Sequence, residues 1–346
     1  MTQSNSVQAL FQPFTLHNLT LNNRIVMAPM TRQFSPEGVP GSDVAAYYRR
    51  RAENNVGLIV TEGTIIDHPD ASNQQNVPHI YGEAALKGWE KVVSDVHAAG
   101  GKIIPQIWHM GARGQVGDYT EQEVQEIVQQ FAKSAASAKE IGFDGIELHG
   151  AHEYLIDQFF WNKTNPRTDR YGGDMVQRTR FAVEVIEACR EAVGPDFPIV
   201  FRFSQWKGSD YSAKLAETPE ELERFLQPLS DAGVDVFHCS TRRFWQPEFE
   251  GSDLNLAGWT KKLTGKPTIT VGSVGLDGEF MSLFKEGKGA EVSGIDDLLH
   301  RLEQGEFDFV AIGRALLADP AWASKIQEGR LDELVAFSPA ALQTLN

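Results

Sequence analysis

Three side chains that can exchange protons lie within six residues of one another, directly after an apolar segment. Asp144 to Leu148 has the composition of a buried strand, and His149, His152 and Tyr154 follow it. If a helix began here, the two histidines would be three positions apart and would share one face, with the tyrosine beside them. Two imidazoles and a phenol in this arrangement could hold a carbonyl oxygen and supply a proton.

Two simpler interpretations of these residues stay open at this point. The histidines could be ordinary polar residues at the start of a helix, or they could join Glu147 as ligands of a metal ion. A metal-dependent hydrolase with a barrel fold would also need histidines from its first strand, but the first apolar run of this chain, Arg24 to Met27, leads into Ala28-Pro29-Met30, which brings none. We therefore predict no metal site.

The composition predicts a soluble, globular protein. The 346 residues are 41% hydrophobic, which is enough to fill one core, and the formal net charge is −15. An acidic chain without a basic tract disfavours nucleic acid as a partner. We find no signal peptide and no apolar run long enough for a membrane span, so we expect a cytoplasmic protein. Cys189 and Cys239 are too few to ligate an iron–sulfur cluster, which disfavours the dienoyl reductases that carry one, and both are expected to be buried thiols.

Short apolar runs alternate with helix-like segments along the whole chain. Most runs are continuously hydrophobic, as strands of a parallel sheet covered by helices should be. Eight alternations predict one (β/α)8 TIM barrel domain over residues 1–346, preceded by a hairpin near His17-Asn18 that plugs the barrel floor. A doubly wound sheet is the alternative, but it usually has fewer strands, and no G-x-G-x-x-G motif follows the first one. The predicted strands are Arg24 to Met27, Gly57 to Thr61, Lys102 to Trp108, Asp144 to Leu148, Pro198 to Phe203, Val234 to Cys239, Pro267 to Val271 and Phe307 to Ile312.

In such a barrel the chemistry lies at the carboxyl ends of the strands. The sequence places amide, guanidinium, hydroxyl and glycine groups there, a set that would fit the edge of a flat heterocycle better than a hard metal ion. The last two strands end in Gly272-Ser273 and Gly313-Arg314, where glycine-rich backbone, an arginine and a nearby helix N-terminus make a phosphate site. The sequence therefore predicts a cofactor that ends in a phosphate.

The same residues carry a resemblance to a known family. Nearly end to end, the chain resembles the old yellow enzymes, which are ene-reductases that depend on flavin mononucleotide (FMN). The matching motifs are Asn23 to Arg32, Thr61 to Thr64, Gln106 to Trp108, His149 to Leu155, Asn165 to Gly173, Phe201 to Ser204 and Ala311 to Arg314.

The resemblance implies a noncovalently bound FMN and a place for each residue around it. The guanidinium of Arg202 would lie beside N1 of the flavin ring, where it would stabilise the negative charge that reduced flavin carries. The residues implied are Ala28, Pro29, Met30, Gly63, Gln106 and His149 around the ring, Thr31 near the C4 carbonyl and N5, Arg202 beside N1 and the C2 carbonyl, and Gly272, Ser273, Gly313 and Arg314 at the phosphate.

The implied reaction has two halves that share one site in a ping-pong mechanism. Hydride passes from NADH or NADPH to the flavin, and then to the β-carbon of an activated alkene such as an α,β-unsaturated carbonyl compound or a nitroalkene. His149 and His152 would bind the alkene oxygen, Tyr154 would protonate the α-carbon, and Thr31 would complete the catalytic set. We expect a monomer or a homodimer.

Aromatic residues are expected to shape the substrate pocket. Trp108 fits a place in the barrel core and a place in the pocket equally well. Trp245 and its neighbour Phe244 lie in a polar loop, where exposed rings would be a liability unless they roofed the site.

Four departures from the family pattern stand out. The connection Gly111 to Tyr119 is considerably shorter than the usual segment, which helps to cover the flavin and the mouth of the site. A flavin-binding protein without turnover is the alternative that this shortening leaves open. Glu153 replaces a small residue, Met30 a frequent leucine and Ala311 a frequent glycine, and none of these removes a catalytic group.

Overall fold

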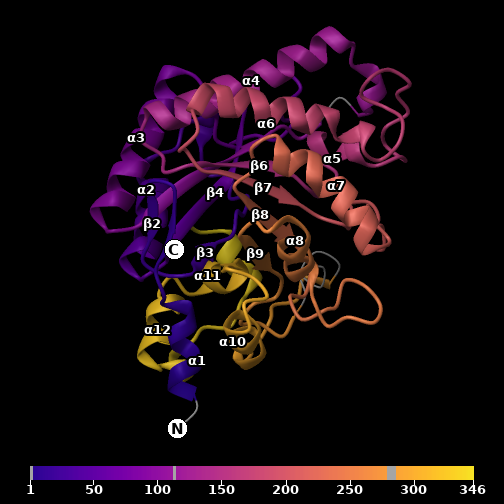
Figure 1. Cartoon of the computed structure of the whole chain (residues 1–346). Coiled ribbons are helices and arrows are strands. Elements are labelled where there is room, and N and C mark those ends of the chain that lie inside the picture. Colours follow the sequence, from indigo (N-terminus) through magenta and orange to yellow (C-terminus); the bar gives the residue numbers. More distant parts are fainter. Residues whose placement is uncertain (1–2, 112–113, 279–285) are drawn as a thin grey trace.

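Eight parallel strands close into a barrel in the computed structural model, and helices cover its outer surface (Figure 1). The structure describes residues 3–111, 114–278 and 286–346. Strands that follow one another along the chain are paired, and β10 closes the ring onto β3, which confirms the predicted (β/α)8 fold. The barrel strands are β3 Ile25–Met27, β4 Leu58–Ile65, β5 Lys102–Trp108, β6 Ile146–Gly150, β7 Ile199–Phe203, β8 Val236–Ser240, β9 Thr268–Val271 and β10 Phe309–Ile312.

Within the described residues, three helices, α4, α7 and α8, begin at a residue whose side chain caps the helix: Thr120, Thr218 and Asn255. At the start of the longest one, α4, the Thr120 hydroxyl accepts the N–H of Glu123, and the Glu123 carboxylate accepts the N–H of Thr120. No helix in this part of the chain has the length and apolar character needed to cross a lipid bilayer. The helices are α1 Gln3–Leu10, α2 Ser42–Glu53, α3 Glu83–Ala98, α4 Glu121–Glu140, α5 Leu155–Phe160, α6 Arg180–Val193, α7 Pro219–Asp231, α8 Leu256–Thr264, α10 Asp296–Glu303, α11 Arg314–Ala318 and α12 Trp322–Glu328.

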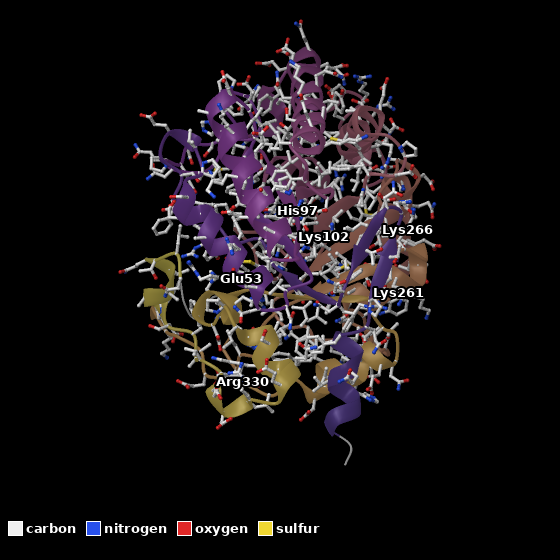
Figure 2. All side chains as sticks on the ribbon, turned by 90° about the vertical axis from the view of Figure 1, so that its left-hand side faces the viewer. Glu53, His97, Lys102, Lys261, Lys266 and Arg330 are labelled. Carbon is white, nitrogen blue, oxygen red and sulfur yellow. The ribbon has the colours of Figure 1, made fainter. Side chains whose placement is uncertain are left out.

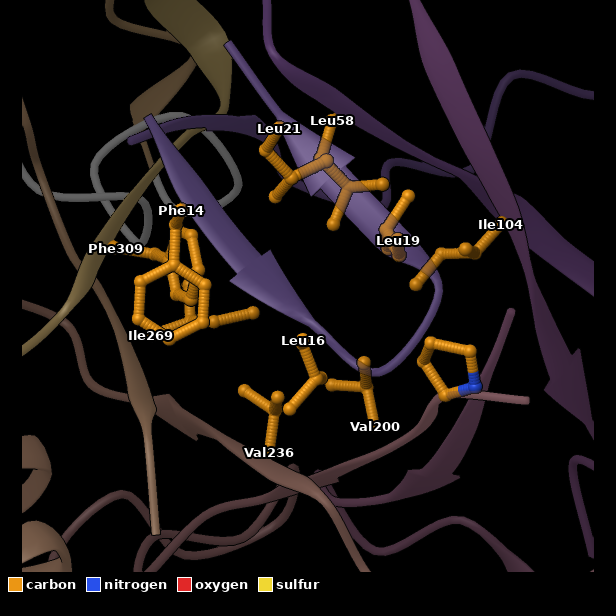
Figure 3. Close-up of a pocket in the computed structure, with 11 residues that line it drawn as sticks. Phe14, Leu16, Leu19, Leu21, Leu58, Ile104, Val200, Val236, Ile269 and Phe309 are labelled. Carbon is orange, nitrogen blue, oxygen red and sulfur yellow. The ribbon is translucent and has the colours of Figure 1, made fainter. Parts of the chain in front are cut away.

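A hairpin of β1 Phe14–Leu16 and β2 Leu19–Leu21 closes the barrel floor, as predicted. Leu19 and Leu21 are buried in an apolar cluster with inward-facing strand residues such as Val200. A cavity of about 20 Å³ remains between the hairpin and the strands, and apolar side chains and Pro198 line it (Figure 3). The space could hold one water molecule, but no side chain offers it a hydrogen bond, so it should be dry.

Three aspartates tie the strands together at the floor. Each precedes a strand, accepts a main-chain N–H near the start of the strand before it, and pairs with basic side chains. His97 and Lys102, which share one of these aspartates, lie side by side in Figure 2. The contacts are Asp144 with Ile103 N (2.8 Å), His97 (2.8 Å) and Lys102 (3.2 Å), Asp235 with Ile199 N (2.9 Å), Arg190 (2.6 Å) and His17 (2.9 Å), and Asp308 with Thr268 N (3.0 Å) and Lys261 (3.0 Å). Polar groups at this end therefore serve stability, and the opposite rim is left for chemistry.

Both cysteines are buried thiols, as expected. Burial raises the pKa of Cys189 and of Cys239, so neither thiol ionises readily.

Candidate active site

Strand register brings the first candidate residues together on the carboxyl rim of the barrel. His149, near the end of β6, stands opposite Arg202 of β7, and Arg202 stands opposite His238 of β8. The pairing of β6 with β7 continues as far as Gly150, so His149 is a strand residue.

His149 and His152 do not share a helical face, so that prediction was wrong. The strand pairing carries His149 past the expected strand end, and α5 begins only at Leu155. Between them the chain makes a left-handed turn, with φ of 64° at His152 and 68° at Glu153. The turn still brings the two imidazole rings together, with centroids 5.3 Å apart and planes at 87°. We call His149, His152 and Tyr154 the clamp.

Hydrogen bonds hold this turn in a conformation that side chains rarely adopt. The His152 N–H donates to Ser204 Oγ (3.0 Å), and the Glu153 N–H donates to Asp157 Oδ2 (2.7 Å). The Glu153 carboxylate also accepts the N–H of Ser209 in the loop after β7 (2.8 Å). Glutamate is thus tolerated at a position where the φ value favours glycine.

We expect Glu153→Gly to be more stable than Glu153→Ala by about 1 kcal/mol. Both variants lose the bond to Ser209, but only alanine keeps a Cβ in the left-handed region. Urea unfolding of the two proteins at equal cofactor saturation measures the difference. Equal stabilities would show that the turn is not strained.

Both clamp histidines are held in the neutral form. Burial, followed by the positive charge of Arg202, lowers the pKa of His149 and of His152 well below the usual range. The Ala151 N–H donates to Nδ1 of His149 (3.3 Å), so the ring proton of this histidine lies on Nε2 and can be donated.

We therefore expect both rings to be neutral at about pH 5.5, where an ordinary exposed imidazole is mostly protonated. A lowered pKa means that the neutral form persists as the pH falls below the usual value. Nitrogen-15 chemical shifts of the ring atoms in histidine-labelled protein report the charge, with single His→Gln variants for assignment. A protonated His149 or His152 at about pH 5.5 would contradict this assignment.

Tyr154 and Trp108 complete the aromatic wall around the clamp. The Tyr154 ring lies edge-on to His149 (4.8 Å) and to Trp108 (4.8 Å), and burial raises the pKa of its hydroxyl, so it keeps its proton. Trp108 is buried, and its ring also contacts the clamp residue His149. The side chain therefore belongs both to the barrel core and to the wall of the site, the two positions that the sequence allowed. A Cβ on Gly63 would lie 2.3 Å from the Trp108 ring, so the glycine is needed there.

Arg202 is buried on the rim with few partners. Its Nη2 reaches Ser240 Oγ at 3.4 Å, and its Nε has no hydrogen-bond partner among the described residues. Glu147 points into the barrel, where it accepts a bond from Gln106 (2.8 Å) and pairs with His238 (2.7 Å). The trio of Glu147 with the clamp histidines does not form, and the described residues hold no group of three possible metal ligands.

The predicted phosphate residues meet at the ends of β9 and β10. The Ser273 hydroxyl lies within hydrogen-bond distance of the carbonyls of Arg242 and Gly278 (3.1 Å each) and can donate its one proton to either, and Arg314 Nη2 reaches Ser273 Oγ at 3.5 Å. Gly272 has a φ of 145°, and a Cβ there would meet the backbone of the loop after β8. Gly313 directly precedes α11.

Two further predicted residues are exposed. Thr31 is exposed just after β3. Trp245 is 36% exposed and packs edge-on against Phe244 (5.1 Å), and within the described residues its ring makes no contact with the clamp. Phe244 was expected to roof the site together with Trp245, but its ring is buried in the core: its backbone bonds Gly272 and the Asn255 side chain, and this draws the ring inward.

The Asn165 to Gly173 motif fixes the short connection after β5 through hydrogen bonds. The Arg167 guanidinium donates to the carbonyls of Val116 (2.7 Å) and Tyr119 (2.5 Å), and both of these side chains are buried. Residues 112 and 113 of the connection lie outside the described part of the chain.

Sequence reasoning missed an ion pair beneath the clamp. Lys207, after β7, pairs with Asp157 of α5 at 2.5 Å, and both side chains are completely buried. Asp157 is the same carboxylate that accepts the Glu153 N–H. A carboxylate inside the apolar run Leu155–Phe160 was the one signal that could have revealed the pair.

Comparisons with known proteins agree with this geometry. The chain matches the model of the NADH:flavin oxidoreductase / NADH oxidase family over residues 9–121 and 115–333, and the two matches meet at the short connection. It is 36% identical to an NADH oxidase of Thermoanaerobacter brockii, over 94% of this chain and 52% of that protein. It is 32% identical to an NADPH dehydrogenase of Bacillus velezensis, over 91% of this chain and 93% of that protein. The chain thus spans about half the length of the first relative and nearly all of the second.

A solved structure of a morphinone reductase variant in complex with tetrahydroNAD is also similar. It has a TM-score of 0.79 and 26% identity, and the match covers 96% of this chain and 93% of that one. These findings confirm the resemblance to old yellow enzymes: the chain belongs to the NADH:flavin oxidoreductase / NADH oxidase family, whose cofactor is FMN.

Proposed function

We propose that this protein is an ene-reductase that takes hydride from NADH or NADPH and delivers it to the β-carbon of an activated alkene. The observation that carries the proposal is the approach of the three clamp side chains beside the buried Arg202. The imidazoles would polarise a carbonyl or nitro oxygen, and the phenol would supply a proton.

The rim fits FMN. A buried arginine nitrogen without an acceptor is costly, and the carbonyl edge of an isoalloxazine ring would satisfy Nε of Arg202. Ser273 and Arg314 offer a hydroxyl and a guanidinium for the phosphate. The residues that we assign to the ring are Ala28, Pro29, Met30, Thr31, Gly63, Gln106, His149 and Arg202, and those that we assign to the phosphate are Gly272, Ser273, Gly313 and Arg314. When bound, the flavin supplies hydride transfer through N5.

Contacts of Ser240 indicate which ring nitrogen of His152 would donate a hydrogen bond to the substrate. The Ser240 hydroxyl lies 2.7 Å from Nε2 of His152 and 3.4 Å from Nη2 of Arg202. An arginine can only donate, so the serine oxygen accepts from it and the serine proton is free to go to Nε2. The ring proton of His152 would then lie on Nδ1, and His149 would donate from Nε2 to the same substrate oxygen.

Tyr154 is the proton donor in this proposal. Its hydroxyl stays protonated because burial raises its pKa, and its ring is packed against His149 and Trp108. A substrate whose oxygen is held by the clamp would therefore present its α-carbon to a fixed phenol.

Two measurements on the purified protein test the proposal. Acid precipitation should release FMN into the supernatant, and anaerobic stopped-flow mixing should show flavin reduction by NADH or NADPH followed by reoxidation with 2-cyclohexenone or a nitroalkene. An adenine dinucleotide in the supernatant would contradict the cofactor assignment. Reduction without reoxidation by any activated alkene would show a flavin-binding protein that is not an ene-reductase.

We expect His149→Ala to weaken the binding of simple phenols by about 1.5 to 3 kcal/mol, the range for a hydrogen bond to a charged group. A phenolate places an oxyanion where the enolate oxygen would lie. Spectral titration of the bound flavin measures the affinity, and the flavin content serves as the control for cofactor binding. Unchanged phenol affinity would remove His149 from the clamp.

A further inference from the structure

A cavity of about 430 Å³ opens beside the clamp, between the loops that follow β7 and β8. It is separate from the dry cavity at the floor, and Ser240 connects it to the proposed site because it lines the cavity and also bonds His152. The side chains that matter for its chemistry are Trp206, Tyr211, Ser212, Lys214, Arg242 and Gln246.

A stacked row of side chains runs from the clamp into this cavity. The Trp206 ring lies flat against His152 (4.3 Å, 19° between planes), and the Tyr211 ring lies against Trp206 (5.4 Å, 28°). The guanidinium of Arg242 lies 5.5 Å from the Tyr211 ring. Trp206 is fixed in the row because its Nε1–H donates to the Ser240 carbonyl (3.1 Å).

The charge of the cavity wall is opposite to that of the whole chain. The formal net charge of the protein is −15, yet the lining carries Lys214, Arg242 and Arg243 against the single carboxylate of Glu248. Lys214 pairs with that carboxylate at 3.4 Å. Within the described residues no carboxylate pairs with Arg242. Its guanidinium lies over the face of the Tyr211 ring. Such a wall attracts an anion, and an arginine suits a phosphate group.

We propose that this cavity binds the adenosine diphosphate end of the nicotinamide donor, with the diphosphate at Arg242. The proposal rests on the proposed function and deepens it by assigning the residues that select the donor. A simple activated alkene is neutral and needs no arginine, whereas the diphosphate of a dinucleotide does. The row leads from the ring of His152, beside which the nicotinamide end would react, to Arg242.

The test measures binding of ADP-ribose, which lacks the nicotinamide, to the FMN-loaded protein by calorimetry. We expect Arg242→Met to weaken this binding at least tenfold, or about 1.4 kcal/mol. Arg242→Lys should retain part of the affinity because it keeps the charge. Arg224→Met removes an exposed positive charge from α7, outside the cavity lining, and should change the affinity less than twofold.

A second measurement compares donors of different length. The preference of the protein for NADH over reduced nicotinamide mononucleotide, measured as the ratio of their dissociation constants in flavin reduction, should fall about tenfold in Arg242→Met. An unchanged ratio would overturn the proposal.

Two further results would overturn it. One is that the native protein does not bind ADP-ribose, or that Arg242→Met binds it equally well. The other is that Arg242→Met weakens only the binding of a carboxylate-bearing alkene such as cinnamate, which would assign the cavity to an anionic substrate. ADP-ribose does not turn over, so a protein that bound it through Arg242 but reduced no alkene would refute the proposed function and leave this inference standing.

Discussion

Replacement of Tyr154 by phenylalanine is expected to slow alkene-driven reoxidation of the flavin by about a hundredfold or more, while flavin reduction by NADH or NADPH stays near the native rate. The substitution keeps the ring that packs against His149 and Trp108 and removes only the hydroxyl. Protonation of the α-carbon belongs to the alkene half of the reaction, so only that half should suffer. Anaerobic stopped-flow traces of each half-reaction at one pH measure the two rates.

The choice of alkene gives the control. A nitronate is stable enough to leave before it is protonated, so nitroalkenes should reoxidise the Tyr154→Phe flavin with a smaller loss than enones. Equal slowing of both half-reactions would mean that Tyr154 shapes the pocket and donates no proton.

Lys207→Met is expected to lower the free energy of unfolding by about 3 to 5 kcal/mol, the usual cost of leaving one partner of a buried ion pair alone. Burial lowers the pKa of Lys207 and raises that of Asp157, and the attraction between the two opposes both shifts. Without the lysine, Asp157 would stay buried as an unpaired carboxylate or would take up a proton. Urea unfolding of the FMN-loaded protein measures the loss.

Two variants make this result specific. Lys91→Met breaks an exposed pair with Asp95 on α3 and should cost less than about 1 kcal/mol. Lys207→Met with Asp157→Asn should recover much of the stability, because no charge is left unpaired and the amide oxygen can still accept the Glu153 N–H. No recovery in the double variant would show that the lysine acts through packing alone. We also expect Lys207→Met to weaken phenol binding, because Asp157 holds the turn that carries His152.

The barrel could be predicted from the sequence because its strands are short apolar runs separated by helical segments, and these patterns are local. Strand ends were predicted less well. β4 continues to Ile65 past an irregularity between Val60 and Gly63, and β6 continues through the polar His149, because pairing with a neighbouring strand outweighs local composition there.

The proximity of the clamp residues was predicted, but the backbone that creates it was not. Spacing alone suggested a helical turn, whereas the structure uses left-handed residues stabilised by Asp157 of α5 and by Ser204 and Ser209 of the loop after β7. Partners as distant in the sequence as the two serines leave no local pattern. The same holds for Lys207, which reads as an ordinary surface lysine, and for Phe244, whose burial depends on backbone contacts with Asn255 and Gly272.

The dry cavity between the hairpin and the strands makes the stability of the barrel sensitive to hydrostatic pressure. Its empty space exists only in the folded state, so it adds to the decrease in volume when the chain unfolds, and pressure then favours the unfolded chain. Val200 and Val236 line the cavity, and an extra methylene on either one would reduce this empty space. A floor filled in this way would make the barrel less sensitive to compression, with no change to the rim on the opposite side.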